Sequence, residues 1–327
     1  MIFVSRKFVA EWGFPGHGRL MDALRDPYPA VEALLRRFRA QRPLRGGSLL
    51  MTVFGDAVAP RGARVSLGSL IGLAAPFGLA ERLVRTSVAR LAADGWLTAL
   101  RRGRRSEYRL SDTGHGLFAE ATERIYAVSP GTWDGCWTLL AVPPGGGARA
   151  QLRERLRWSG FGQLAPGVFV HPSLAVPRAR SWLPADGGAD GWLFTSRGED
   201  LAADRRLAAA AWDWAELARR YRRFRDAFAP IEACGALRHL SPQSAFVVRT
   251  LLIHEYRKIH LRDPLLPPAL LPEDWIGTEA YALCRRLYAA VFNAAEGHLD
   301  AHASTLDGAL PSAGPEAFAR FGGLAAP

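Results

Sequence analysis

The chain has 327 residues, 49% of them hydrophobic, and 42 basic against 31 acidic residues give it a formal net charge of +11. The length predicts two or three domains, and the charge favours a polyanionic partner such as nucleic acid. The cysteines show no Cys-x-x-Cys spacing, which excludes a disulfide framework and a cysteine zinc site, and no apolar run is long enough to span a membrane, so we expect a cytoplasmic, nucleoid-associated bacterial protein.

Short helical and strand-like patterns follow an extension over residues 1–30, in which we expect no order and in which Met21 offers a second candidate start. Apolar residues recur at helical spacing in 48–59, 68–76 and 80–94, with a short strand-like stretch after the first of these. Two strand-like runs then flank the sequence RRGRR at 101–105, which predicts a β-hairpin with a basic tip. This order is typical of a winged helix-turn-helix, which we assign to residues 31–114.

The third of these helices leaves arginines and a threonine off its apolar face, where a helix set in a major groove would present them to bases and phosphates. The arginines of the hairpin would reach the flanking backbone or the minor groove. The side chains that we expect to contact DNA are Arg82, Arg85, Thr86, Arg90, Arg101, Arg102, Arg104, Arg105 and Tyr108. For any one arginine, a solvated charged surface is the open alternative.

The rest of the chain changes from mixed to helical patterns. A connecting helix over 115–130 leads to strand-like runs separated by an Arg-rich amphipathic helix at 148–160, which predicts a ferredoxin-like α+β module over 131–200. Residues 201–300 follow as a helical domain for effector binding and dimerisation. The Ala/Gly/Pro-biased tail 301–327 is expected to be disordered. The predicted fold class is therefore α+β.

At several ordered segments the sequence resembles the PaaX family, the phenylacetic acid degradation operon repressors. The matching stretches are SLLMTVFGDAV (48–58), GSLIGLAAPFGLAERLVRTSVARLAADGWL (68–97), RRGRRSEYRLSDTG (101–114), WDGCWTLLAVP (133–143), LRWSGFGQLAPGVFVHP (156–172) and AFVVRTLLIHEYRKIHLRDPLLPPALLPEDWIG (245–277). The resemblance implies a homodimeric repressor with a GntR-like winged-helix domain, a central domain similar to the CRISPR-associated ferredoxin-like nucleases, and a helical C-terminal domain. It also implies an aryl-CoA effector, typically phenylacetyl-CoA, that releases the DNA operator.

Five residues near the end of one predicted helix are candidates for an effector pocket, because the phosphates of a CoA thioester suit arginine and lysine. They are His254, Arg257, Lys258, Arg262 and Asp263. Ordinary ion pairing at the helix end is the alternative. The spacing of these histidines is not H-E-x-x-H, so we expect no metal site and no bound cofactor beyond the effector.

The competing class of function is an enzyme: a metal-dependent nuclease or an acyl-CoA hydrolase on the central or C-terminal domain. Asp134 lies near the first strand of the central module, where the similar nucleases keep a metal-binding carboxylate. No second carboxylate stands at an evident pairing distance in the sequence, and no nucleophile motif is present, so we expect no catalytic residue and no enzyme activity. An architectural or RNA-binding module is the third possibility.

Overall fold

The computed structural model describes residues 28–43, 46–127, 132–142, 152–153, 156–157, 159–172, 191–233 and 237–324. The helices are α2 (Pro29–Arg39), α3 (Gly46–Val53), α4 (Leu67–Ala74), α5 (Glu81–Ala93), α6 (Asp112–Tyr126), α9 (Leu201–Ala211), α10 (Trp214–Ala233), α11 (Pro242–His260), α12 (Ile276–His302) and α13 (Pro315–Phe318). The strands are β1 (Arg64–Ser66), β2 (Leu97–Arg102), β3 (Arg105–Leu110), β4 (Cys136–Ala141), β5 (Gly162–Ala165), β6 (Val168–His171) and β7 (Trp192–Arg197). This mixture of helices with two small sheets confirms the predicted α+β class.

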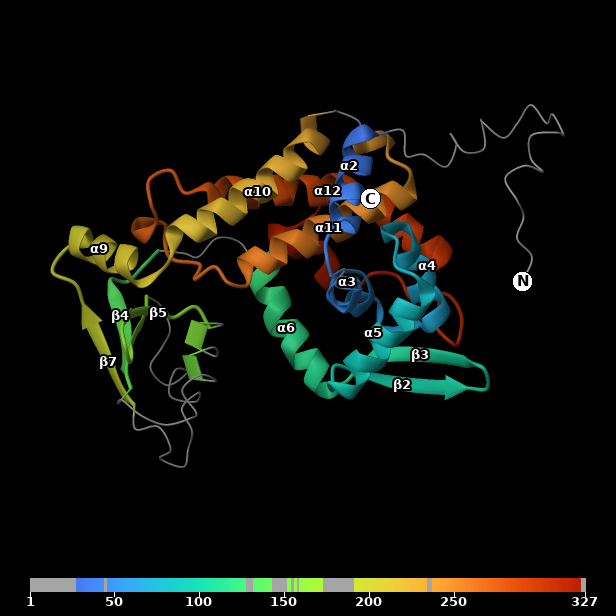
Figure 1. Cartoon of the computed structure of the whole chain (residues 1–327), viewed down its shortest axis with the longest axis horizontal. Coiled ribbons are helices and arrows are strands. Elements are labelled where there is room, and N and C mark those ends of the chain that lie inside the picture. The colour runs from blue at the N-terminus through green and yellow to red at the C-terminus, as the bar shows by residue number, and fades with distance from the viewer. Residues whose placement is uncertain are drawn as a thin grey trace.

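The N-terminal unit has the predicted order of helix, strand, two helices and hairpin (Figure 1). The Ser66 hydroxyl caps α4 by accepting a hydrogen bond from the backbone N–H of Ser69 at 3.1 Å. In α5 the buried residues Val84, Val88 and Leu91 recur at helical spacing, so one face packs on the core and the other faces solvent. Helix α3 begins at Gly46, two residues before the helical pattern expected from residue 48.

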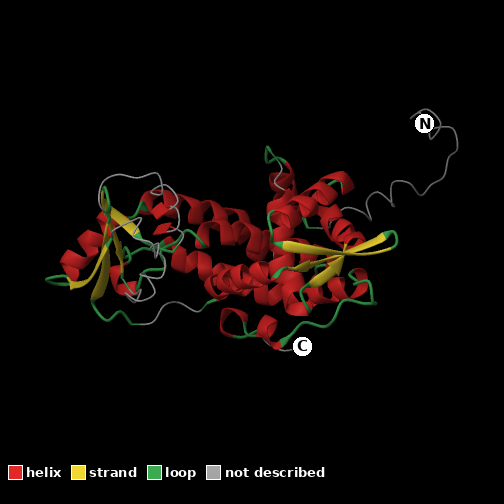
Figure 2. Ribbon diagram, turned by 90° about the horizontal axis from the view of Figure 1, so that it is seen from below, coloured by secondary structure: helices red, strands yellow, loops and turns green. Residues whose placement is uncertain are grey.

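The hairpin is longer than the sequence predicted. Strands β2 and β3 pair from Leu97 with Leu110 out to Arg102 with Arg105, so only Gly103 and Arg104 form the turn. Gly103 adopts φ +59 in this tight turn, a left-handed backbone conformation that costs glycine little energy. The arginines predicted at a five-residue tip therefore lie mostly on the strands, and the hairpin projects from the body of the molecule (Figures 1 and 2).

The central module is an antiparallel sheet with the order β5-β6-β4-β7, and it lies at the opposite end of the molecule from the hairpin (Figure 1). Helix α9 packs on this sheet, where Ala208 and Ala211 join Trp137 and Val170 in one apolar cluster. Residues 201–211 thus belong with the central sheet rather than with the helical domain predicted from 201 onwards.

The sequence did not predict β5, because GQLA is short and weakly apolar. The predicted helix at 148–160 falls largely outside the described residues.

The N-terminal unit and the C-terminal helices share one core rather than forming separate domains. Their buried apolar residues form a single cluster that runs from Val31 in α2 to Phe321 near the C-terminus. Helix α11 is buried along most of its length because α3, α10 and α12 pack around it. Helix α11 therefore packs directly against α3 of the N-terminal unit.

The tail, which we expected to be disordered, is folded against this core. Phe321 and Ala317 are buried, and the backbone carbonyl of Ser304 accepts a hydrogen bond from the N–H of Ser66 at 2.8 Å. Composition concealed this order, because a few apolar side chains and Arg320 anchor a segment that is otherwise rich in Ala, Gly and Pro. Within the described parts of the chain, none of the helices has the length and hydropathy needed to cross a membrane.

Candidate nucleic-acid interface and ligand groove

The solvent face of α5 carries the side chains that the sequence singled out. Exposed on it are Arg82, Arg85, Thr86 and Arg90. Arg85 pairs with Glu81 at 2.7 Å, and Arg90 lies 3.7 Å from Asp94. Such exposed pairs one helical turn apart are worth only about 0.3–0.5 kcal/mol. The arginines can therefore exchange these acids for an external anion at little cost.

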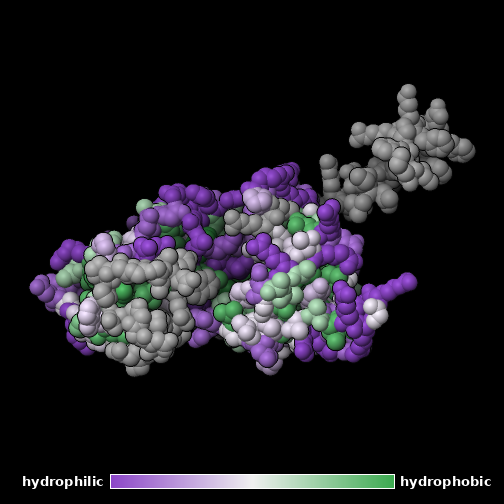
Figure 3. Space-filling model, turned by 60° about the horizontal axis from the view of Figure 1, so that its bottom comes forward, coloured by the Kyte–Doolittle hydropathy of each residue, from purple (hydrophilic) through white to green (hydrophobic). Residues whose placement is uncertain are grey.

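The hairpin adds a second group of arginines, but the structure divides them. Arg101, Arg104 and Arg105 are exposed, and Figure 3 shows a hydrophilic projection where the hairpin leaves the body. Arg102 is also exposed, but it pairs with Asp307 of the C-terminal segment at 2.7 Å. The ring of Tyr108 is half-buried against the core. Tyr108 shares a face of the hairpin with Arg101, because Ala99 pairs with Tyr108 and side chains alternate along a strand.

A groove of about 550 Å³ lies between α2, α10 and α11. It is lined by four of the five predicted effector residues: His254, Arg257, Lys258 and Arg262. Three further arginines, from helices distant in sequence, complete the lining: Arg37, Arg220 and Arg223. The sequence analysis did not assign these three arginines to the groove, although the Arg-rich runs in α2 and α10 indicated cationic helix surfaces. Glu255 also lines the groove, and its carboxylate is already bonded to Lys258 at 2.7 Å.

One wall of the groove is bonded directly to α3. The guanidinium of Arg257 donates to the carbonyl and hydroxyl oxygens of Ser48 and, at 2.8 Å, to the hydroxyl of Thr52. Nδ1 of His254 lies 3.0 Å from the same Thr52 hydroxyl. Burial lowers the pKa of His254 well below its usual value, so this histidine is neutral. Its side chain is buried, so it faces the core and not the solvent.

The fifth predicted effector residue, Asp263, does not line this groove. Its carboxylate accepts hydrogen bonds from the Tyr221 hydroxyl at 2.7 Å and from the backbone N–H of Leu265 at 2.9 Å. Burial raises its pKa. His260 lies in the same cluster, with Nδ1 3.1 Å from the Tyr221 hydroxyl, and burial lowers its pKa to about 3. Both side chains hold the joint after α11 in place.

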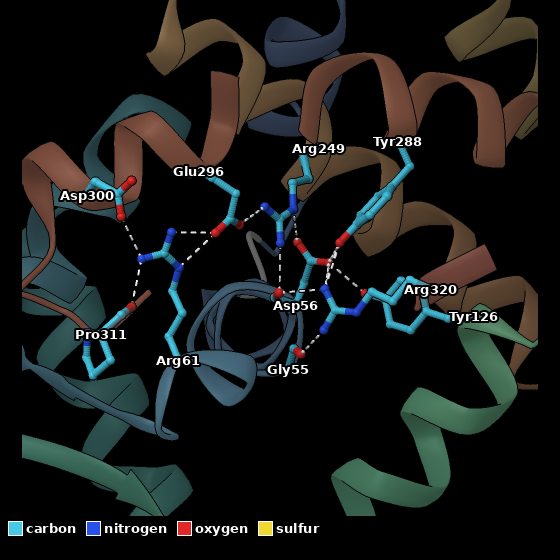
Figure 4. A network of polar contacts seen from close by, with 10 residues as sticks. All are labelled: Gly55, Asp56, Arg61, Tyr126, Arg249, Tyr288, Glu296, Asp300, Pro311 and Arg320. Carbon is cyan, nitrogen blue, oxygen red and sulfur yellow. Dashed lines mark hydrogen bonds and ion pairs between the residues drawn. The ribbon is translucent and has the colours of Figure 1, made fainter. Parts of the chain in front are cut away.

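Sequence reasoning missed a buried ionic network centred on Asp56, in the π-helical turn Phe54–Val58 that follows α3 (Figure 4). The Asp56 carboxylate accepts hydrogen bonds from Arg249 at 2.7 Å, from the Tyr126 hydroxyl at 2.6 Å and from the Tyr288 hydroxyl at 2.8 Å. Burial alone would raise the pKa of Asp56, but the attraction of Arg249 and Arg320 and the two phenol hydrogen bonds hold it below its usual value.

The network continues into α12 and the tail. Glu296 accepts hydrogen bonds from both Arg249 and Arg61, and Arg61 also donates to Asp300 at 2.8 Å. Arg320 donates to the Asp56 carboxylate at 3.1 Å and to the Tyr288 hydroxyl at 2.7 Å. The network thus fixes the N-terminal unit to α6, α11, α12 and the tail, as Figure 4 shows.

Asp134 was the carboxylate that the sequence offered for a nuclease site. Asp134 accepts a hydrogen bond from the backbone N–H of Cys136 at 2.8 Å, which gives its carboxylate a local structural role. In the described ranges, no group of three or more His, Cys, Asp or Glu side chains is placed to hold a metal ion.

Comparison with known proteins identifies relatives along most of the chain. Three family profiles match in order: "PaaX-like protein" over residues 45–114, "PaaX protein central Cas2-like domain" over 130–208, and "PaaX-like protein C-terminal domain" over 212–301. The chain is 38% identical, over 86% of its length and 92% of the relative's, to the protein named Transcriptional repressor PaaX of Escherichia coli (strain K12). A solved structure of an uncharacterized protein from Mycobacterium tuberculosis aligns with 69% of this chain and 88% of its own, at 27% identity and a TM-score of 0.46.

Proposed function

This chain belongs to the PaaX-like protein family, and we propose that it is a DNA-binding transcriptional repressor of phenylacetate or related aromatic acid catabolism genes. The observation that carries the proposal is the 38% identity, along nearly the whole chain, to a protein named as a transcriptional repressor. The proposal assigns no catalytic step to the chain.

In this proposal the N-terminal unit is a winged helix-turn-helix. Helices α4 and α5 form the helix-turn-helix, and α5 enters the major groove with Arg82, Arg85 and Thr86 toward base edges. The hairpin β2–β3 is the wing, whose exposed arginines contact phosphates and anchor the complex. The exposure of these side chains, and the weakness of the ion pair that now holds Arg85, support these roles.

The effector is an aryl-CoA thioester bound in the groove between α2, α10 and α11. The positive side chains there supply partners for its phosphates, and Arg257 can meet one of them with two parallel hydrogen bonds. The groove has a volume of about 550 Å³, within the range of ~300–1,000 Å³ typical of small-molecule sites.

Two copies of the chain act together, as the symmetry of repressor operators requires. A homodimer would place the two α5 helices in successive major grooves, with half-sites about one helical turn apart or a multiple of it. The effector weakens DNA binding because it favours a conformation in which this spacing no longer fits. The bonds from Arg257 to α3 are the direct connection between groove and DNA-binding unit.

A footprint tests the proposal. The purified full chain would be titrated onto the intergenic DNA upstream of its own gene, with and without phenylacetyl-CoA, and free CoA as the matched control ligand. We expect a protected site that disappears with phenylacetyl-CoA and persists with free CoA. Protection that persists in both cases would reject this effector. The absence of any protected site would reject the repressor function itself.

A further inference from the structure

A second hollow of about 420 Å³ adjoins the groove and shares two of its lining residues, Arg220 and Arg262. It lies between the central module and the start of α10, and central-module residues such as Phe161, Gln163 and Phe169 form one side of it. The two hollows therefore lie next to each other around the same pair of arginines.

The two hollows share arginines but differ in the balance of polar and apolar surface. In the groove, cations from α2, α10 and α11 alternate with apolar side chains such as Phe38 and Phe224, and polar and apolar surface are about equal. Glu255, an acid in its wall, is bonded to Lys258.

The second hollow exposes more apolar than polar surface, with aromatic side chains on both sides: Phe161 and Phe169 from the central module, and Trp212 at the entrance to α10. Its lining also includes Arg153 and Arg157 beside the shared Arg220 and Arg262. Of its acids, Glu216 is paired with Arg220 at 2.6 Å.

This division corresponds to the two ends of an aryl thioester of CoA. The nucleotide end carries phosphates, which suit arginine and lysine. The acyl end is an uncharged ring, which suits an apolar pocket with aromatic walls. A flexible arm joins these ends, so the ligand can occupy two adjoining hollows, with its ring in the one that exposes the larger share of apolar surface.

We propose that the second hollow is the acyl-recognition pocket, in which Phe161, Phe169 and Trp212 contact the aromatic ring while the nucleotide lies in the cationic groove. This inference rests on the proposed function, because it takes an aryl-CoA as the ligand. It places the specificity for the acid in the central module. A bound ligand would then contact the central sheet and the C-terminal helices together.

Gln163 is the best position for a test, because its side chain is exposed yet lines the second hollow. A large ring in Gln163→Trp would fill the hollow without disturbing a buried packing position, and Gln163→Ala is the matched control. Binding of phenylacetyl-CoA, acetyl-CoA and free CoA to the full chain would be measured by isothermal titration calorimetry.

We expect the wild type and Gln163→Ala to bind phenylacetyl-CoA about tenfold or more tightly than acetyl-CoA, because a missing apolar group loses at least this much in a fitted pocket. Gln163→Trp should lose that preference and keep the wild-type affinity for free CoA. Equal affinity of Gln163→Trp and wild type for phenylacetyl-CoA would overturn the acyl pocket alone. A wild type that binds none of the three compounds would instead overturn the effector of the proposed function, and the pocket with it.

Discussion

The guanidinium of Arg257 donates hydrogen bonds to the carbonyl oxygen of Ser48 at 2.7 Å and to its hydroxyl at 2.9 Å. Both residues line the groove, Arg257 from α11 and Ser48 from α3 of the N-terminal unit. An anion that enters the groove therefore competes with α3 for the same cation. Because a guanidinium has a limited set of donors in fixed directions, anion binding and the present position of α3 are linked.

The first prediction concerns Arg257→Lys, which keeps the positive charge but loses the planar fork that holds Ser48 and Thr52 together. We expect phenylacetyl-CoA to bind the variant, while the loss of operator affinity that the ligand causes shrinks from about 5–150-fold toward none. Gel-shift titrations with and without ligand would measure this. Lys258→Arg, in the same groove but bonded to Glu255, is the control. An undiminished ligand response in Arg257→Lys would contradict the link.

The second prediction concerns base reading by α5. Replacing Arg82 or Arg85 with Ala should lower operator affinity by ~1–3 kcal/mol and relax the sequence preference if the side chain contacts a base. Loss of the exposed pair between Arg85 and Glu81 is too small to account for such a change. Quantitative gel shifts on operator and scrambled DNA would separate specific from general binding. Arg206→Ala, an exposed change on α9, is the control. If the α5 variants bind the operator as tightly as this control does, Arg82 and Arg85 do not contact bases.

The third prediction concerns Asp307, which holds both Arg64 and Arg102 at 2.7 Å beside the hairpin. Asp307→Ala should free Arg102 and leave Arg64 with only Glu107 at 3.9 Å, so affinity for DNA of any sequence should rise and the salt dependence should steepen by about one unit in log K against log salt. Asp226→Ala changes the net charge equally but removes a partner of Arg225 on α10, so it controls for charge alone. Salt titrations of non-specific DNA binding would decide. The same slope in both variants would mean that Arg64 and Arg102 do not reach phosphate.

The sequence revealed the features that depend on local spacing. The apolar faces of α5 and α11 and the pairing of β2 with β3 follow from residues close together in the chain, and His254 and Arg257 were found together because one helix carries both. Arg37 and Arg220 could not be assigned to the groove, because only the packing of α2 and α10 against α11 brings them to it.

The buried ionic network was equally out of reach. Asp56 follows an apolar run and has the appearance of a residue on the solvent side of a helix, yet its partners Arg249, Tyr288 and Arg320 come from three later segments. For the same reason the tail was wrongly expected to be disordered. Its order depends on the pairing of Arg320 with Asp56, which no local pattern records.

The fourth prediction tests that network. In Asp56→Ala the guanidinium groups of Arg249 and Arg320 lose a carboxylate in a site from which water is excluded. Breaking a buried pair in this way costs about 3–5 kcal/mol, more than an average point substitution. Urea unfolding of the full chain would measure the change. Glu279→Ala removes an exposed partner of Arg225 and should change the stability by less than about 1 kcal/mol. Equal midpoints for the two variants would show that the network does not stabilise the fold.

The fifth prediction concerns acid pH. Burial lowers the pKa of His260 to about 3 and of His298 to about 4, and it also lowers the pKa of His254 well below its usual value. In the unfolded chain each would titrate near pH 6.5. Between these values the unfolded state binds more protons, so stability falls as the pH falls, by up to about 1.4 kcal/mol per pH unit for each histidine.

Asp263 acts in the opposite direction, because its raised pKa makes the folded state bind more protons above the usual pKa of aspartate. One aspartate cannot offset three histidines, so the urea midpoint should fall from pH 7 to pH 5. His298→Gln removes one of the three histidines whose pKa is lowered, so the midpoint of this variant should fall less steeply with pH, by the contribution of about one proton. His115→Gln, an exposed change on α6, should follow the wild type. A midpoint that stays level or rises toward pH 5 would mean that these histidines are not held neutral by burial, and that His254 in the groove wall would be free to carry a charge toward an anionic ligand.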